Sequence, residues 1–148
     1  MKIQKLVLPL CLFGLTQISG AAEFTVKMLT SGPDKTTLVF DPMYVKAAVG
    51  DTVTFQPMDK LGHTSMSVFT PEGASPWKAA PNNEVKVTLN KEGVYLVACE
   101  VHKMMGMVAV LQAGKPVNLA EAKKKAAEES AKMATNKDRF NKLLAMVK

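Results

Sequence analysis

The chain has 148 residues and a formal net charge of +6, and only 6% of its residues are aromatic. This length indicates one domain with room for an appendage. The sequence has no dense basic stripe interleaved with aromatic residues, which argues against nucleic acid as a partner and favours acidic protein surfaces.

The first 22 residues have the composition of an export signal. Lys2 and Lys5 precede an apolar run over residues 6–18, and small residues follow at 19–22. A positive start, a short apolar stretch and a small-residue exit predict a cleaved signal peptide over residues 1–22. The alternative, a membrane anchor, is disfavoured because the run is too short to span a bilayer. We expect the mature protein to be soluble, with no membrane segment.

The region from residue 23 to 112 is predicted to be a β-sandwich. Apolar and polar residues alternate, as in "FTVKM" from Phe24 to Met28, which is typical of strands with one buried face. Eight strands are expected, at residues 24–28, 38–40, 44–47, 52–55, 64–69, 85–89, 93–99 and 107–111. Short strands separated by turn residues, without intervening helices, predict an antiparallel sandwich or barrel.

The region from residue 113 to 148 has a different composition, rich in Ala, Glu and Lys. Asn118 and Glu121 form a capping-box variant, and Thr135 or Asn136 is a candidate for a second helix cap. An apolar stripe with i, i+3, i+4, i+7 spacing follows, made of Phe140, Leu143, Leu144 and Val147. We therefore predict two short helices whose stripe packs on the sandwich, since isolated helices of this length are marginal.

The stretch "CEVHKMMGM", Cys99 to Met107, concentrates sulfur and imidazole groups. Cys11 leaves with the predicted signal, so Cys99 would be the only cysteine of an exported protein. An unpaired thiol is open to oxidation there unless it is buried or bound to a metal. His63, the only histidine besides His102, lies on a loop between two other predicted strands. If the two loops meet at one pole of the sandwich, a thiolate, two imidazoles and a thioether come together.

This donor set is that of an electron-transfer copper site, in which two imidazoles and a thiolate surround the ion and a weak thioether lies on the axis. The predicted ligands are His63, Cys99, His102 and Met107. We choose Met107 because it opens a strand, whereas Met104 and Met105 can pack as apolar filler. A stiff sandwich would limit rearrangement when an electron moves.

Three other interpretations compete with copper. A structural zinc site prefers four good ligands, and a thioether is a poor fourth one. A Cys–His nucleophile pair needs a third residue to orient the base and leaves His63 without a role. A buried cysteine beside an incidental histidine is the simplest alternative, because Cys-x2-His alone is a weak motif. The joint use of both histidines, the single cysteine and a methionine in an exported all-β protein argues against it.

These residues resemble those of the cupredoxins, the small blue copper proteins, and within that family the pseudoazurins. Cys99, His102 and Met107 match the family pattern Cys-x2-His-x4-Met with its "MGM" ending, and "VTF", Pro57 and "DK" precede His63 as in that family. The resemblance implies a Greek-key cupredoxin sandwich with two C-terminal helices and one Cu(I)/Cu(II) ion. It also implies a monomeric, periplasmic one-electron shuttle that is not an enzyme.

The resemblance further implies a docking surface, an apolar patch over the exposed ligand histidine ringed by lysines. Leu61, Met104 and Met105 are candidates for the patch, and the candidate lysines are Lys60, Lys78 and Lys103. The implied partners are redox proteins with acidic surfaces, such as nitrite reductase or a c-type cytochrome. The alternative function is a periplasmic copper-storage or copper-delivery protein, in which the methionine cluster hands over Cu(I).

The sequence departs from the family pattern close to the predicted ligands. Thr64 stands where asparagine usually follows the first ligand histidine, and Thr30 replaces another asparagine near the end of the first strand. Leu61 is an insertion, Val101 replaces a proline, and Glu100 adds an acid beside the ligand cysteine. We expect the two threonines to change the hydrogen bonds around the ligands and thereby the reduction potential.

Overall fold

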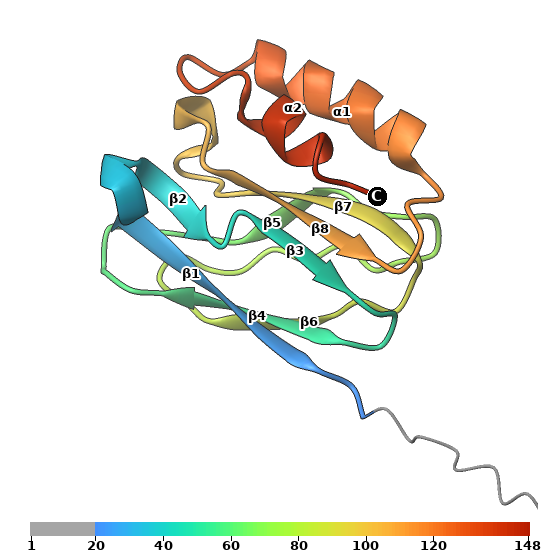
Figure 1. Ribbon diagram of the computed structural model, residues 1–148. Helices are drawn as coiled ribbons and strands as arrows, with labels where there is room; N and C mark the ends of the chain where they lie inside the picture. The colour runs from blue at the N-terminus through green and yellow to red at the C-terminus, as the bar shows by residue number, and fades with distance from the viewer. Residues whose placement is uncertain (1–19) are drawn as a thin grey trace, which may run out of the picture.

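The computed structural model describes residues 20–148, so the predicted export signal lies outside the described residues except for its last three positions. The described chain forms eight strands followed by two α-helices, with two short 3-10 helices, η1 and η2, in the connections (Figure 1). The elements are β1 (Glu23–Ser31), η1 (Pro33–Lys35), β2 (Thr37–Asp41), β3 (Tyr44–Ala47), β4 (Thr52–Pro57), β5 (Met66–Phe69), β6 (Val85–Thr88), β7 (Gly93–Ala98), η2 (Lys103–Met105), β8 (Val108–Ala113), α1 (Leu119–Ala131) and α2 (Arg139–Leu144). Each strand of the described residues therefore overlaps a segment that was predicted to be a strand.

The strands form two four-stranded sheets that face each other. Their orders are β2-β1-β4-β6 and β3-β8-β7-β5. The expected antiparallel pairing is wrong in two places, because β1 pairs parallel with β4 and β3 pairs parallel with β8. Alternation along a strand reports which face is buried, but it carries no information on the direction of the neighbouring strand.

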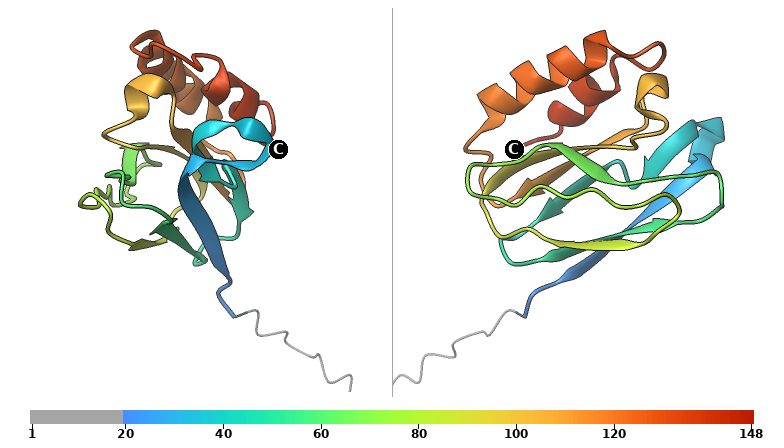
Figure 2. Two further views of the ribbon diagram at one scale, coloured as in Figure 1. Left: turned by 90° about the vertical axis from the view of Figure 1, so that its left-hand side faces the viewer. Right: turned by 180° about the vertical axis from the view of Figure 1, so that it is seen from behind.

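Strands β7 and β8 are buried on both faces, which explains their nearly continuous apolar sequences. One set of their side chains, including Tyr95, Val97 and Leu111, joins the core between the two sheets. The alternate set, including Leu96 and Val110, faces the two helices. The sheet β3-β8-β7-β5 is therefore the middle layer of the molecule (Figures 1 and 2).

The two helices cover the outer face of the middle sheet, as their apolar stripe predicted. Phe140, Leu143 and Leu144 are buried against β7 and β8. Asn118 occupies the predicted N-cap position of α1, but its side chain makes no cap bond and pairs with the backbone of Val94, accepting at 2.7 Å and donating at 3.1 Å. The second predicted cap is wrong, because the N-cap residue of α2 is Asp138 rather than Thr135 or Asn136. No helix of residues 20–148 is long and apolar enough to cross a bilayer.

The strand directions bring two loops to the same end of the sandwich. Residues 58–65 connect β4 to β5, and residues 99–107 connect β7 to β8. Both loops lie at the left-hand end in Figure 1, and we call them the first loop and the second loop. This is the meeting of loops that the sequence predicted.

Candidate metal centre

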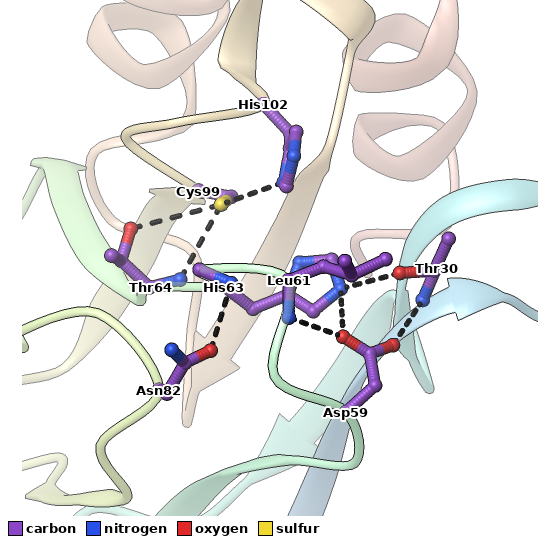
Figure 3. Close-up of polar contacts among 9 residues, drawn as sticks. Thr30, Asp59, Leu61, His63, Thr64, Asn82, Cys99 and His102 are labelled. Carbon is purple, nitrogen blue, oxygen red and sulfur yellow. Dashed lines mark hydrogen bonds and ion pairs between the residues drawn. The ribbon is translucent and has the colours of Figure 1, made fainter.

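Cys99 follows the last residue of β7 and continues the inward-facing set of that strand, so its side chain is completely buried. It is a free cysteine. The backbone N–H of Thr64 donates to its Sγ at 3.4 Å, and the Thr64 hydroxyl lies 3.7 Å from the same atom (Figure 3). These donors stabilise negative charge on sulfur, and the thiolate is the form that binds a metal.

His63 on the first loop is also fully buried, and its two ring nitrogens have different surroundings. Nε2 lies 3.0 Å from the Thr30 hydroxyl and 3.3 Å from Oδ1 of Asp59. Nδ1 has no hydrogen-bond partner among residues 20–148. Buried polar atoms are almost always paired, so an unpartnered imidazole nitrogen is the kind of vacancy that a metal ion satisfies.

His102 lies three residues beyond Cys99, and its Nδ1 is 3.6 Å from Sγ of Cys99. The His102 ring lies 5.0 Å from the His63 ring, centroid to centroid. One ligand atom each from His63, Cys99 and His102 can be chosen so that all lie within 4.8 Å of one another. Burial, and then the neighbouring His63, hold the pKa of His102 below its ordinary value, which favours the neutral imidazole that binds metals.

Met107 is fully buried in the same apolar cluster as Cys99. The backbone N–H of Cys99 donates to its carbonyl at 3.0 Å, which closes the second loop. Met104 and Met105 behave differently, with 49% and 42% of their surfaces exposed. Among the methionines of the second loop, only Met107 is thus held in the interior.

Thr64 links the two loops, although the family usually has asparagine at this position. Its hydroxyl accepts a hydrogen bond of 2.8 Å from the backbone N–H of Glu100, next to Cys99. Its own N–H and hydroxyl both approach the sulfur. A threonine therefore links the first loop to the second through one hydroxyl group.

Sequence reasoning missed two residues that hold the loops in place. Asp59 was noted only as part of the "DK" motif, yet its carboxylate touches His63 and accepts backbone N–H bonds from Thr30 and Leu61. Although burial alone raises the pKa of Asp59, these hydrogen bonds and the nearby His63 bring it below its ordinary value. Arg139 of α2 donates to the carbonyl of Gly106 at 2.6 Å. The position of Asp59, four residues before His63, was the only available signal.

The donor set fits copper better than the alternatives considered for the sequence. A buried sulfur with N–H donors, a buried imidazole with a free nitrogen and a second neutral imidazole are soft and borderline ligands, which suit copper in both oxidation states. The buried cysteine is not isolated, because two histidine rings surround it. This contradicts the simplest alternative, an incidental neighbour in sequence.

Comparisons with known proteins agree with this chemistry. The family described as copper-binding proteins of the plastocyanin/azurin type matches residues 26–114. The pseudoazurin of Methylorubrum extorquens is 44% identical over 108 residues, which cover 71% of this chain and 72% of that protein. The pseudoazurin of Paracoccus pantotrophus is 36% identical over 114 residues, covering 76% and 78% respectively.

The fold of the chain is also similar to that of a solved pseudoazurin structure. The crystal structure of native pseudoazurin from Hyphomicrobium denitrificans superimposes with a TM-score of 0.78 at 40% identity, covering 86% of this chain and 99% of that one. The predicted cupredoxin sandwich with two C-terminal helices is thereby confirmed. The chain belongs to the copper-binding plastocyanin/azurin family and, within it, to the pseudoazurins, which are blue copper electron-transfer proteins.

Proposed function

We propose that His63, Cys99, His102 and Met107 hold one copper ion and that the loaded protein carries single electrons between redox proteins. The observation that carries this proposal is the cluster of three ligand atoms, one each from His63, Cys99 and His102, that lie within 4.8 Å of one another. When bound, copper supplies the Cu(I)/Cu(II) couple. The protein supplies rigid ligands and exchanges electrons without transforming a substrate, so we do not class it as an enzyme.

Electrons would enter and leave at His102, the only ligand of the proposed set that is not fully buried. The two loops expose apolar side chains around this pole, and we call this set the apolar rim: Leu61, Val101, Met104 and Met105, exposed by 42–60%. An apolar rim excludes water from a contact that must form and break quickly. Such a surface suits a transient redox partner.

The proposed partners carry acidic docking surfaces, with nitrite reductase and c-type cytochromes as the candidates. Lys60 and Lys103 lie on the two loops beside the rim and would attract such surfaces. Lys78 contributes less, because its ammonium pairs with Glu100 at 2.6 Å. The steering field is therefore weaker than the number of lysines suggested.

The proposed location is the periplasm, and the support for it is the export-signal pattern of residues 1–22 together with an unpaired Cys99 held among metal ligands. We keep the proposed division into a signal at 1–22, a cupredoxin sandwich at 23–112 and a helical extension at 113–148. The buried apolar face between the extension and β7 and β8 supports treating the last two as one folding unit.

The test is to load residues 23–148 with Cu(II), record the visible spectrum, and mix the loaded protein with a reduced c-type cytochrome. A strong thiolate-to-copper band that bleaches as the cytochrome is oxidised, with copper retained on the chain, supports the shuttle. A second mixture with a metal-free copper acceptor tests the alternative. Transfer of the ion to the acceptor, without electron exchange, would replace the shuttle by copper delivery.

A further inference from the structure

The polar contacts of His63 form a network that the sequence motif of the predicted ligands did not indicate. Its Nε2 lies beside two side-chain oxygens from different segments, the hydroxyl of Thr30 at the end of β1 and the carboxylate of Asp59 on the first loop (Figure 3). The Asp59 carboxylate is itself fixed, because the N–H of Thr30 donates to Oδ2 at 3.1 Å and the N–H of Leu61 donates to Oδ1 at 3.0 Å. It is therefore pre-organised against the ring.

The charge of Asp59 favours one of the two tautomers of the ring. A carboxylate only accepts hydrogen bonds, so a carboxylate oxygen 3.3 Å from Nε2 favours the tautomer with its hydrogen on Nε2. In that tautomer the lone pair of Nδ1 is free, and Nδ1 is the ring nitrogen that has no hydrogen-bond partner in the described part of the chain. The orientation of His63 for a metal is thus set before any metal arrives.

The same contact also places negative charge against the ring. His63 is fully buried and only 32% of the Asp59 side chain is exposed, so water screens this charge incompletely. A carboxylate on the far nitrogen makes the imidazole a more basic ligand. A more basic ligand stabilises the higher charge of Cu(II) more than that of Cu(I).

We propose that Asp59, assisted by the Thr30 hydroxyl, is a positioning residue that holds Nδ1 of His63 toward the metal and lowers the reduction potential of the bound copper. This inference rests on the proposed copper site. It assigns to the first loop the tuning of the potential, a role that is separate from electron exchange at His102.

The experiment compares wild-type protein with Asp59→Asn, which keeps the shape and removes the charge. We expect Cu(II) binding to weaken about tenfold more than Cu(I) binding, which raises the one-electron reduction potential by about 59 mV. Thr30→Val should raise it less, because the carboxylate remains. Glu72→Gln removes the same charge from an exposed turn and should leave the potential unchanged.

A second readout needs no copper. In the metal-free wild-type protein, nitrogen NMR of the imidazole should find the proton of His63 on Nε2, and a proton on Nδ1 would overturn the inference. An intact copper band with an unchanged potential in Asp59→Asn would overturn it too, while leaving the copper site in place. If Asp59→Asn fails to fold, the nitrogen NMR of the metal-free wild-type protein still tests the inference. Absence of the band in wild-type protein would instead overturn the copper site itself and this inference with it.

Discussion

The two loops of the candidate centre are held in place by different means. The first loop fixes a fully buried histidine through side chains, with Asp59 and Thr30 on Nε2 of His63. The second loop is held through its backbone, because three consecutive carbonyl groups accept hydrogen bonds from the C-terminal region. The segment between α1 and α2 donates to the carbonyls of residues 104 and 105, and Arg139 of α2 donates to that of residue 106. His102 on the second loop remains partly exposed.

This difference separates two tasks of an electron carrier. A ligand that sets the potential benefits from a buried, polar and fixed environment, where charge is poorly screened. A ligand that passes electrons must reach the surface. The second loop is therefore stabilised through its backbone carbonyl groups, which leaves its exposed side chains free to contact a partner. The C-terminal region therefore supports the second loop without contributing one of the proposed ligands.

Removing the Cys99 thiol tests the proposed copper site, to which both loops contribute. Cys99→Ala is expected to abolish the thiolate-to-copper band completely, because sulfur is the origin of that transition in the proposed site. The cavity left by one sulfur atom in a closely packed core costs only about 1 kcal/mol, so far-UV circular dichroism should be unchanged. A band that survives in the folded variant would contradict the assignment of Cys99.

Replacing methionines of the second loop separates its buried end from its exposed face. Met107→Leu keeps the volume and costs less than about 1.5 kcal/mol of stability, yet it should shift the visible spectrum and raise the potential, because the axial sulfur is lost. Met105→Leu is the matched control, since Met105 is 42% exposed. Equal spectra for the two variants would contradict the choice of Met107.

Cutting the support behind the second loop tests its backbone anchoring. Arg139→Gln removes charged donors from the carbonyls of Gly106 and Leu38, and a charge-assisted bond of this kind is worth about 1.5–3 kcal/mol. We expect that loss in the free energy of unfolding, together with faster release of copper to a chelator. Lys142→Gln, which alters an exposed ion pair of the same helix, is the control. Identical release rates for both variants would show that α2 does not support the loop.

The smallest effect concerns the exposed side of the second loop. Glu100→Gln frees Lys78 from its ion pair, so association with an acidic redox partner should be faster at low salt. Exposed pairs are worth about 0.2–1 kcal/mol, which limits the gain to about fivefold. Stopped-flow rates at low and high ionic strength measure it, and the gain should vanish at high salt. A slower rate in the variant would contradict steering by lysines.

The sequence predicted the parts of the structure that depend on local patterns. Alternation located every described strand, and the apolar spacing of Phe140, Leu143 and Leu144 predicted their burial. His63, Cys99 and His102 were expected to meet and do so. Each of these features follows from the period of the element and the position of a residue at its end.

The sequence did not predict how polar side chains outside the ligand set are used. Thr135 and Asn136 have the chemistry of helix caps, but their side chains donate to the carbonyl of Met105 at 3.1 Å and 2.8 Å. A hydroxyl or amide group bonds equally well to a helix end or to a distant carbonyl, so composition cannot decide between them. The contact of Asp59 with His63 likewise depends on the path of the first loop, which no periodicity encodes.

The central claim is that the two loops close around one copper ion with sulfur and imidazole ligands. X-ray absorption at the copper edge of the loaded protein tests it most directly. We predict one short copper–sulfur distance and two imidazole nitrogens, with the same ligands after reduction. A copper shell of nitrogen and oxygen alone, in protein whose Cys99 is still a free thiol, would contradict the claim.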